Sequence, residues 1–129
     1  MSSWKQSFEI VRQELELAKR KKQALDELLA KKRMSELTYE HLEKALTASI
    51  LDLEAHQRSL ADKMTGRADE LEEQVHVLEW VLADLEVRRA GEEVVEETYS
   101  GQKKTIVLGI SATKAELDEI KMSLEKIPY

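Results

Sequence analysis

Apolar residues recur along this chain in alternating steps of three and four residues. In the first segment, residues 3–33, the recurring positions are Phe8, Val11, Leu15, Ala18, Leu25 and Leu29, with Lys22 standing in one place of the series. Steps of this kind align apolar side chains on one stripe of an α-helix, which is the heptad seam of a coiled coil. We therefore predict a helix over residues 3–33 that packs against another helix along this seam.

A longer helix is predicted over residues 36–90. Ser35, a residue that favours the N-cap position, precedes it, and no proline interrupts it. Its seam consists of Leu46, Ile50, Leu53, Gln57, Leu60, Met64, Arg67, Leu71, Val75, Leu78, Leu82 and Leu85. Gly66 is its weak point, because glycine costs a helix about 1 kcal/mol relative to alanine. If the helix breaks at Gly66, four segments of similar length form a four-helix bundle, which is the alternative architecture.

A third helix is predicted over residues 95–127, where Pro128 ends it. Its seam is the most regular of the three and consists of Ile106, Ile110, Thr113, Leu117, Ile120, Leu124 and Ile127. Gly91 follows two arginines and is expected to close the preceding helix as its C′ residue.

The chain is expected to reverse direction at two corners, near residues 34–35 and 92–93. The predicted fold is therefore all-α, with three helices in two antiparallel coiled-coil hairpins that share the long central helix. No segment shows the sustained alternation that predicts a strand. We expect one helical domain over residues 1–129.

Some apolar residues lie outside the heptad seam. They concentrate near the second corner and are Val77, Trp80, Val81, Val87, Val107 and Leu108. One antiparallel partner helix cannot cover both the seam and these positions. Because apolar side chains grouped on a helical surface usually mark a contact site, we predict that these six residues bind a second copy of the chain, in a dimer or higher oligomer.

Charge divides the chain unevenly. Residues 1–34 hold nine Lys or Arg and five Asp or Glu, whereas residues 35–129 hold eleven Lys or Arg and 21 Asp or Glu. The whole chain has a net charge of −6. This net charge argues against a protein that binds nucleic acid over its whole surface. The asymmetry favours packing of one end on the other, or contact of a basic tip with an acidic partner.

The basic run Lys19, Arg20, Lys21 and Lys22 allows two interpretations. It could contact an anionic membrane surface, nucleic acid or an acidic protein segment. Alternatively, it is a solvated helix face, or it pairs with carboxylates such as Asp52 and Glu54 on the next helix. The second interpretation is the simpler one.

Little in the sequence indicates catalysis. No cysteine, glycine-rich phosphate loop or nucleophile elbow is present. Glu73 and His76 match half of a di-iron motif, but the second half is missing. We expect no enzyme activity, cofactor, metal or small-molecule substrate. No apolar run is long enough to span a bilayer and no signal peptide is evident, so a cytoplasmic location is expected.

The two corner sequences resemble a known family. RMSELTYEHL at residues 33–42 precedes a long heptad helix, and LEVRRAGEEVVEETY covers residues 85–99. Together they resemble the coiled-coil region of archaeal CdvA-like proteins, part of the ESCRT-related cell-division machinery, over residues 25–127. The family also has an N-terminal β-barrel domain, for which the helical pattern leaves no room here. The resemblance implies a self-assembling scaffold that recruits ESCRT-III-like partners.

The leading hypothesis is accordingly a homo-oligomeric helical scaffold or adaptor, in archaeal cell division or membrane remodelling. The alternative is a peripheral membrane or nucleic-acid binding protein that uses the run from Lys19 to Lys22.

Overall fold

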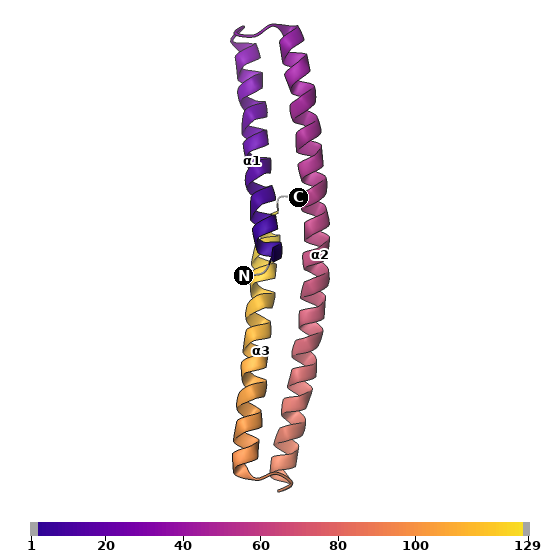
Figure 1. Cartoon of the computed structure of the whole chain (residues 1–129), viewed down its shortest axis with the longest axis vertical. Helices are drawn as coiled ribbons and strands as arrows, with labels where there is room; N and C mark the ends of the chain where they lie inside the picture. Colours follow the sequence, from indigo (N-terminus) through magenta and orange to yellow (C-terminus); the bar gives the residue numbers. More distant parts are fainter. Residues whose placement is uncertain (1–2, 128–129) are drawn as a thin grey trace. The chain divides into compact units, whose positions relative to one another are not determined.

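The computed structural model describes residues 3–127, which form three α-helices and no strand (Figure 1). They are α1 (Ser3–Ala30), α2 (Glu36–Ala90) and α3 (Glu96–Glu125). The all-α prediction is confirmed. α1 ends three residues before its predicted end, and α3 ends two residues before its predicted end. Pro128, which was expected to end the third helix, lies outside the described residues.

The chain divides into two compact units, Met1–Asp62 (unit 1) and Lys63–Tyr129 (unit 2). α2 contributes its first part to unit 1 and its last part to unit 2. It remains helical through Gly66, where an added Cβ would meet no atom within 4 Å. The break on which the four-helix alternative depended is therefore absent. A single domain over residues 1–129 stays a prediction.

Within unit 1, α1 and the first part of α2 run in opposite directions. The hydroxyl group of Tyr39, near the start of α2, donates to Asp26 Oδ1 near the end of α1 at 2.7 Å. Further from the corner, Ala24 and Leu46 line one groove together with Leu28 and Leu42. Residue numbers thus fall along α1 as they rise along α2. The five-residue connection between the helices leaves no room for a crossover.

Within unit 2, the last part of α2 and α3 are likewise antiparallel. Ion pairs join Glu86 to Lys103 at 3.2 Å, Glu72 to Lys121 at 3.0 Å and Arg67 to Glu116 at 3.3 Å. Between them, a Cβ added to Gly109 would lie 3.6 Å from Leu78 Cδ1. Figure 1 shows α3 alongside the last part of α2.

The predicted seams are where the side chains are buried. Every seam position named above is buried or half-buried, and Leu71 and Ile120 are 1% and 0% exposed. Lys22, which stands in the seam of α1, is half-buried. Each fully buried leucine or isoleucine contributes about 1.5–3 kcal/mol, so the seams supply most of the stability.

The seam of α2 contains one irregularity. Leu71 and Val75 are both buried although they follow Arg67 at two successive steps of four, and Gln74 between them is exposed. Two consecutive steps of four form a stutter, which locally unwinds the left-handed supercoil of a heptad coiled coil. α2 therefore changes its winding in this part of unit 2.

Corner 1, residues 31–35, ends α1 with a Schellman motif. The backbone N–H of Arg33 donates to the carbonyl of Leu28 and that of Lys32 to the carbonyl of Leu29, both at 2.9 Å. Lys32 has a φ of 57°, which ends the helix before the predicted residue. Ser35 then caps α2 as predicted, because its Oγ accepts the backbone N–H of Thr38 at 3.2 Å.

Corner 2, residues 91–95, repeats corner 1 sixty residues later. The backbone N–H of Glu93 donates to the carbonyl of Arg88 at 2.9 Å and that of Glu92 to Arg89 at 3.1 Å. The left-handed residue is Glu92, with a φ of 62°, and no glycine has a positive φ. The prediction that Gly91 takes the C′ position was therefore wrong by one residue.

A tyrosine fastens each corner. Tyr99 donates its hydroxyl to the carboxylate of Glu86 at 2.8 Å and accepts Lys103 Nζ at 3.1 Å. Sixty residues earlier, Tyr39 donates to Asp26 and accepts Lys22 Nζ at 3.3 Å. Each ammonium group also lies over the tyrosine ring, at 5.4 and 5.5 Å. The acid and the tyrosine come from the two antiparallel helices, so each pair ties one helix to the other.

These contacts shift the titration of the acids. The hydrogen bond from Tyr99, and then that from Lys103, lowers the pKa of Glu86 from its ordinary value of 4.5. At corner 1, the hydrogen bond from Lys22, and then that from Tyr39, lowers the pKa of Asp26 from 3.8. A carboxyl group with a lowered pKa stabilises the folded state above its unfolded-state pKa and loses this effect as the pH falls through the lowered value.

We predict that Tyr99→Phe lowers the free energy of unfolding at pH 7, because Glu86 loses the largest contribution to its lowered pKa. The difference from the unmodified protein should shrink as the pH falls below 4.5, where Glu86 becomes protonated. Urea unfolding followed by circular dichroism from pH 3 to 7 measures the loss of unfolding free energy at pH 7 and its dependence on pH. Glu14→Gln, at an exposed carboxylate of α1, is the control. A difference that is constant over this range would contradict the role given to the Tyr99–Glu86 bond.

Candidate association surface

The six apolar residues predicted outside the seam are all exposed, and all lie in unit 2. Their exposed fractions are 45% for Val77, 71% for Trp80, 46% for Val81, 70% for Val87, 44% for Val107 and 61% for Leu108. Four are on α2 and two on α3. Within unit 2, α3 therefore leaves a substantial part of each of these side chains open to solvent.

Their positions around the helices follow from the helical repeat. Trp80 and Val87 on α2, and Leu108 on α3, each follow a seam residue by two positions. At about 100° per residue, they lie about 200° from that seam residue, on the outer side of their helix. Val107 lies about 100° from Ile106. The six side chains thus surround unit 2 and do not form one flat patch.

On α2, the exposed residues form a second series. Val77, Trp80, Asp84 and Val87 are separated by three, four and three residues, which is heptad spacing. We call these four residues the outer seam. It contains three exposed apolar side chains, whereas the first seam of α2 already packs within its own unit. A helix with two seams of heptad spacing can pack against helices on two sides.

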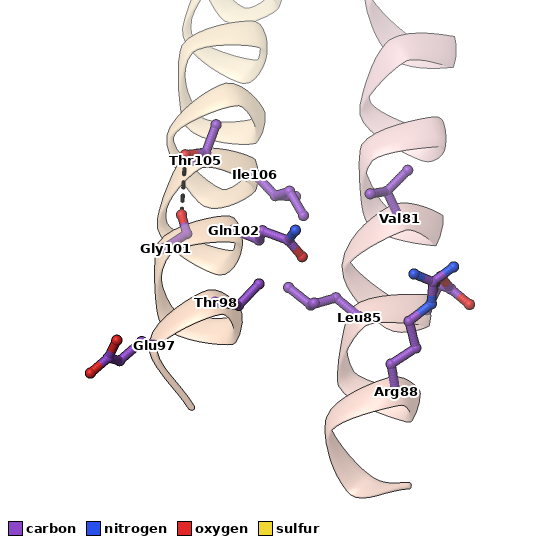
Figure 2. Close-up of a pocket in the computed structure, with 10 residues that line it drawn as sticks. Val81, Leu85, Arg88, Glu97, Thr98, Gly101, Gln102, Thr105 and Ile106 are labelled. Carbon is purple, nitrogen blue, oxygen red and sulfur yellow. Dashed lines mark hydrogen bonds and ion pairs between the residues drawn. The ribbon is translucent and has the colours of Figure 1, made fainter. Parts of the chain in front are cut away.

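Two grooves lie beside the outer seam. Val81 lines one of about 620 Å³, where Leu85 and Ile106 point toward the opposite helix (Figure 2). Val77 lines the other, of about 520 Å³, together with Leu78. The grooves bring Val77 and Val81 next to half-exposed residues of the first seam. The other four predicted residues line neither groove.

Unit 2 is incompletely buried near corner 2. Leu78 and Leu82 on α2, and Ile106 and Ile110 on α3, belong to the first seam but are only half-buried. Leu117 and Ile120, further from the corner, are 8% and 0% exposed. Leu85, nearer the corner, is 4% exposed, so within unit 2 these half-buried seam residues lie beside Val77 and Val81 and do not extend through the whole end of the pair.

Charged residues border this surface. Asp84, within the outer seam, accepts Arg88 Nε at 3.0 Å. Glu70 and Glu73 line the groove that contains Val77. An apolar centre with a charged border is the usual composition of a protein–protein contact.

The basic run on α1 lies in unit 1. Lys19, Arg20 and Lys21 are exposed and form no ion pair with another residue between 3 and 127. Lys22 instead pairs with Asp26 of its own helix at 2.8 Å, which, together with the hydroxyl of Tyr39, raises the pKa of the lysine. The expected pairing of this run with Asp52 or Glu54 is not seen in the described residues.

The hydrophobic spacing gave no signal for two exposed residues of unit 1. Leu37 and Leu51 are 79% and 61% exposed. Leu37 immediately follows the first residue of α2 and Leu51 directly follows the seam residue Ile50, so both lie beside the seam. They are fourteen residues apart with the polar Lys44 midway between them, and exposure of single leucines is common in soluble proteins.

Among residues 3–127, no three or more His, Asp or Glu side chains gather closely enough to hold a metal ion. Glu73 and His76 are both exposed. None of the helices in this part of the chain combines the length and the apolar character that a bilayer crossing requires. The absence of enzyme activity stays a prediction.

Comparison with known proteins gives two matches. Over 127 residues the chain is 23% identical to Cell division protein A of Sulfolobus acidocaldarius, an alignment that covers 98% of the chain and 53% of that protein. The chain thus spans about half the length of this curated relative. No solved structure matches it. Residues 3–128 match the CdvA-like coiled-coil domain. Because this match covers nearly the whole chain, the protein belongs to the CdvA-like coiled-coil domain family, as its corner sequences indicated.

Proposed function

We propose that this protein is a non-enzymatic helical scaffold that binds further copies of itself through the outer seam of unit 2. The observation that carries the proposal is the exposure of Val77, Trp80 and Val87 at heptad spacing on a helix whose first seam is already used. Exposed apolar residues at this spacing gain free energy when another helix covers them. A tryptophan at the centre of such a surface is a common source of binding energy.

A second copy is the occupant that the spacing favours. The steps of three, four and three read the same in both directions along α2. When two copies meet antiparallel about a two-fold axis, Val77 of one copy therefore lies opposite Val87 of the other, and Trp80 opposite Asp84. Two-fold contacts of this self-complementary kind dominate homo-oligomers. Val81 and the adjoining grooves extend the contact on one side, and Val107 and Leu108 offer further apolar area on α3.

The family suggests the process in which the scaffold acts. The relative from Sulfolobus acidocaldarius is named as a cell division protein. By this relation, we propose a role in archaeal ESCRT-like cell division or membrane remodelling, in the cytoplasm, with ESCRT-III-like proteins as partners. The proposed role needs no cofactor, metal or small-molecule substrate, because the binding surfaces are made by side chains alone.

Replacing Trp80 with glutamate should weaken contact through the outer seam. In the antiparallel register the new carboxylate lies opposite Asp84 of the other copy, so like charges meet where Trp80 would pack, while a residue that is 71% exposed adds little to the stability of the single chain. Sedimentation equilibrium at 0.5 M salt, which screens contacts between exposed charges, should show an oligomer for the unmodified protein and at least a tenfold weaker association for Trp80→Glu, on the order of 1.4 kcal/mol or more.

Leu51→Glu is the matched control. Leu51 is an exposed apolar residue on the same helix, but it lies in unit 1 and outside the outer seam. Its association should equal that of the unmodified protein, and circular dichroism should show equal helix content for all three proteins. A monomeric unmodified protein at tens of micromolar would refute the proposal, as would equal effects of the two substitutions.

A second candidate function is binding to an anionic membrane surface or to nucleic acid. The observation in its favour is that Lys19, Arg20 and Lys21 are exposed and unpaired within the described part of the chain. Basic residues near an anionic lipid surface contribute about 1 kcal/mol each.

The triple substitution Lys19→Glu, Arg20→Glu and Lys21→Glu tests this candidate. If the run is a binding site, it should abolish sedimentation with phosphatidylserine vesicles, or binding to duplex DNA, at 0.1 M salt. The control is the triple substitution Lys44→Glu, Arg58→Glu and Lys63→Glu, at exposed residues of α2, which alters the net charge equally. Equal losses for both triple variants would show dependence on net charge alone, and no binding by the unmodified protein would exclude the candidate.

A further inference from the structure

The two corners combine one backbone structure with opposite charges. Positions 31, 32 and 33 of corner 1 hold Lys, Lys and Arg, and the equivalent positions 91, 92 and 93 of corner 2 hold Gly, Glu and Glu. The next helices begin with Glu36 in one case and with Glu96 and Glu97 in the other. Equivalent backbone positions thus present ammonium and guanidinium groups at corner 1 and carboxylates at corner 2.

Charged residues occupy the position where glycine would be least strained. Lys32 and Glu92 both have a left-handed φ, a conformation that costs an ordinary residue about 1–2 kcal/mol. At corner 2, a glycine is present one residue earlier, at Gly91, where φ is not positive. Strain that persists at a surface position is a reason to look for a function of the side chain. Here the strained residues are also the ones with opposite charges.

These charged side chains form no ion pair in the part of the chain that the structure describes. Lys32, Arg33, Glu92 and Glu93 are all exposed, and none forms an ion pair with another residue between 3 and 127. By contrast, Glu96 of the same corner pairs with Arg89 at 3.0 Å. Each corner also exposes one large apolar side chain, Leu37 (79%) at corner 1 and Val95 (67%) at corner 2. Both corners thus offer unpaired charges beside an apolar side chain.

We infer that corner 1 of one copy binds corner 2 of another copy. Lys32 and Arg33 would face Glu92 and Glu93, and Leu37 and Val95 would supply the apolar part of the contact. The two halves of this contact are different surfaces, and every copy carries both. A contact of this heterologous type repeats from copy to copy and builds a ring or an open filament. It is separate from the outer seam and does not depend on it.

Charge complementarity favours a second copy over an unrelated partner. Any anionic molecule could attract Lys32 and Arg33, and any cationic one Glu92 and Glu93. The chain itself carries both sets, on corners of the same backbone structure. Because the charges are exposed, the attraction should weaken with salt, whose screening length is about 10 Å at 0.1 M.

Charge exchange between the corners tests this inference. One variant carries Lys32→Glu and Arg33→Glu, and so has two acidic corners. The other carries Glu92→Lys and Glu93→Lys, and so has two basic corners. Both are made together with Trp80→Glu, so that contact through the outer seam does not contribute. Association is measured by sedimentation velocity at 0.05 M and 0.5 M salt, with circular dichroism as the check of folding.

The reference protein, carrying Trp80→Glu alone, should associate at low salt and less at high salt. Each corner variant alone should associate about tenfold more weakly or worse, because two attractive pairs become repulsive. An equimolar mixture of the two should restore association, as should one chain that carries both exchanges. Restoration in the mixture requires contact between copies, because a contact within one chain cannot be repaired by another.

A further variant separates the contact from folding. Glu92→Gly removes a charge from corner 2 and also relieves the left-handed strain. It should raise the unfolding temperature and yet weaken association. If Glu92 had only a structural role, its replacement would not change the unfolding temperature and the strength of association in opposite directions. The inference is overturned if the mixture does not restore association, if salt has no effect, or if the reference protein does not associate. Failure of the outer-seam proposal would leave these results unchanged, because Trp80→Glu is present throughout.

Discussion

Two packed helices can shield from water only the side chains that lie between them, and this limit governs the rest of the structure. The first seams of α1, α2 and α3 provide that shielded layer, with Leu71 and Ile120 almost completely buried. Within unit 2 the layer is thinner at Leu78 and Ile106, which are only half-buried, although Leu85 nearer corner 2 is 4% exposed. The same stretch of α2 carries the exposed outer seam. A helix pair that leaves so much apolar surface in water gains from a further helix, and this is the physical basis of the proposal that the chain binds its own copies.

The corners illustrate a second constraint, which is that a short connection must still satisfy the backbone groups at the end of a helix. Both corners meet it with the same Schellman motif, the same left-handed residue and the same tyrosine on the following helix. The side chains at the corner are then free to differ, because they do not form the motif. That freedom allows one structure to present lysine and arginine at corner 1 and glutamate at corner 2.

Much of the fold could be predicted from the spacing of apolar residues, because a heptad seam has a strong period and each seam residue proved buried or half-buried. The helix ends were less certain. Lys32 and Glu92 take a left-handed conformation for which neither residue type is a signal, so α1 ends early and Gly91 was given the wrong position. The exposure of Trp80 and Leu108 was foreseen because both fall outside the seam.

Other features could not be foreseen from single residues. The hydrogen bonds from Tyr99 to Glu86 and from Tyr39 to Asp26 depend on which residues of the two antiparallel helices face one another. That register between the helices is fixed only when they pack. The basic run was treated as one group, whereas packing separates Lys22, which joins Asp26, from its exposed neighbours. Sequence spacing also gave the six apolar residues as a set but not their distribution around the two helices of unit 2.

The central claim is that the outer seam of α2 meets the same seam of another copy. Photo-crosslinking from position 80 tests it most directly, with benzoylphenylalanine in place of Trp80 and a mixture of ¹⁴N- and ¹⁵N-labelled protein to separate contacts between copies from those within one. We predict mixed-isotope crosslinks to residues 77–88. Crosslinks within single chains only, or mixed ones outside unit 2, would contradict the account.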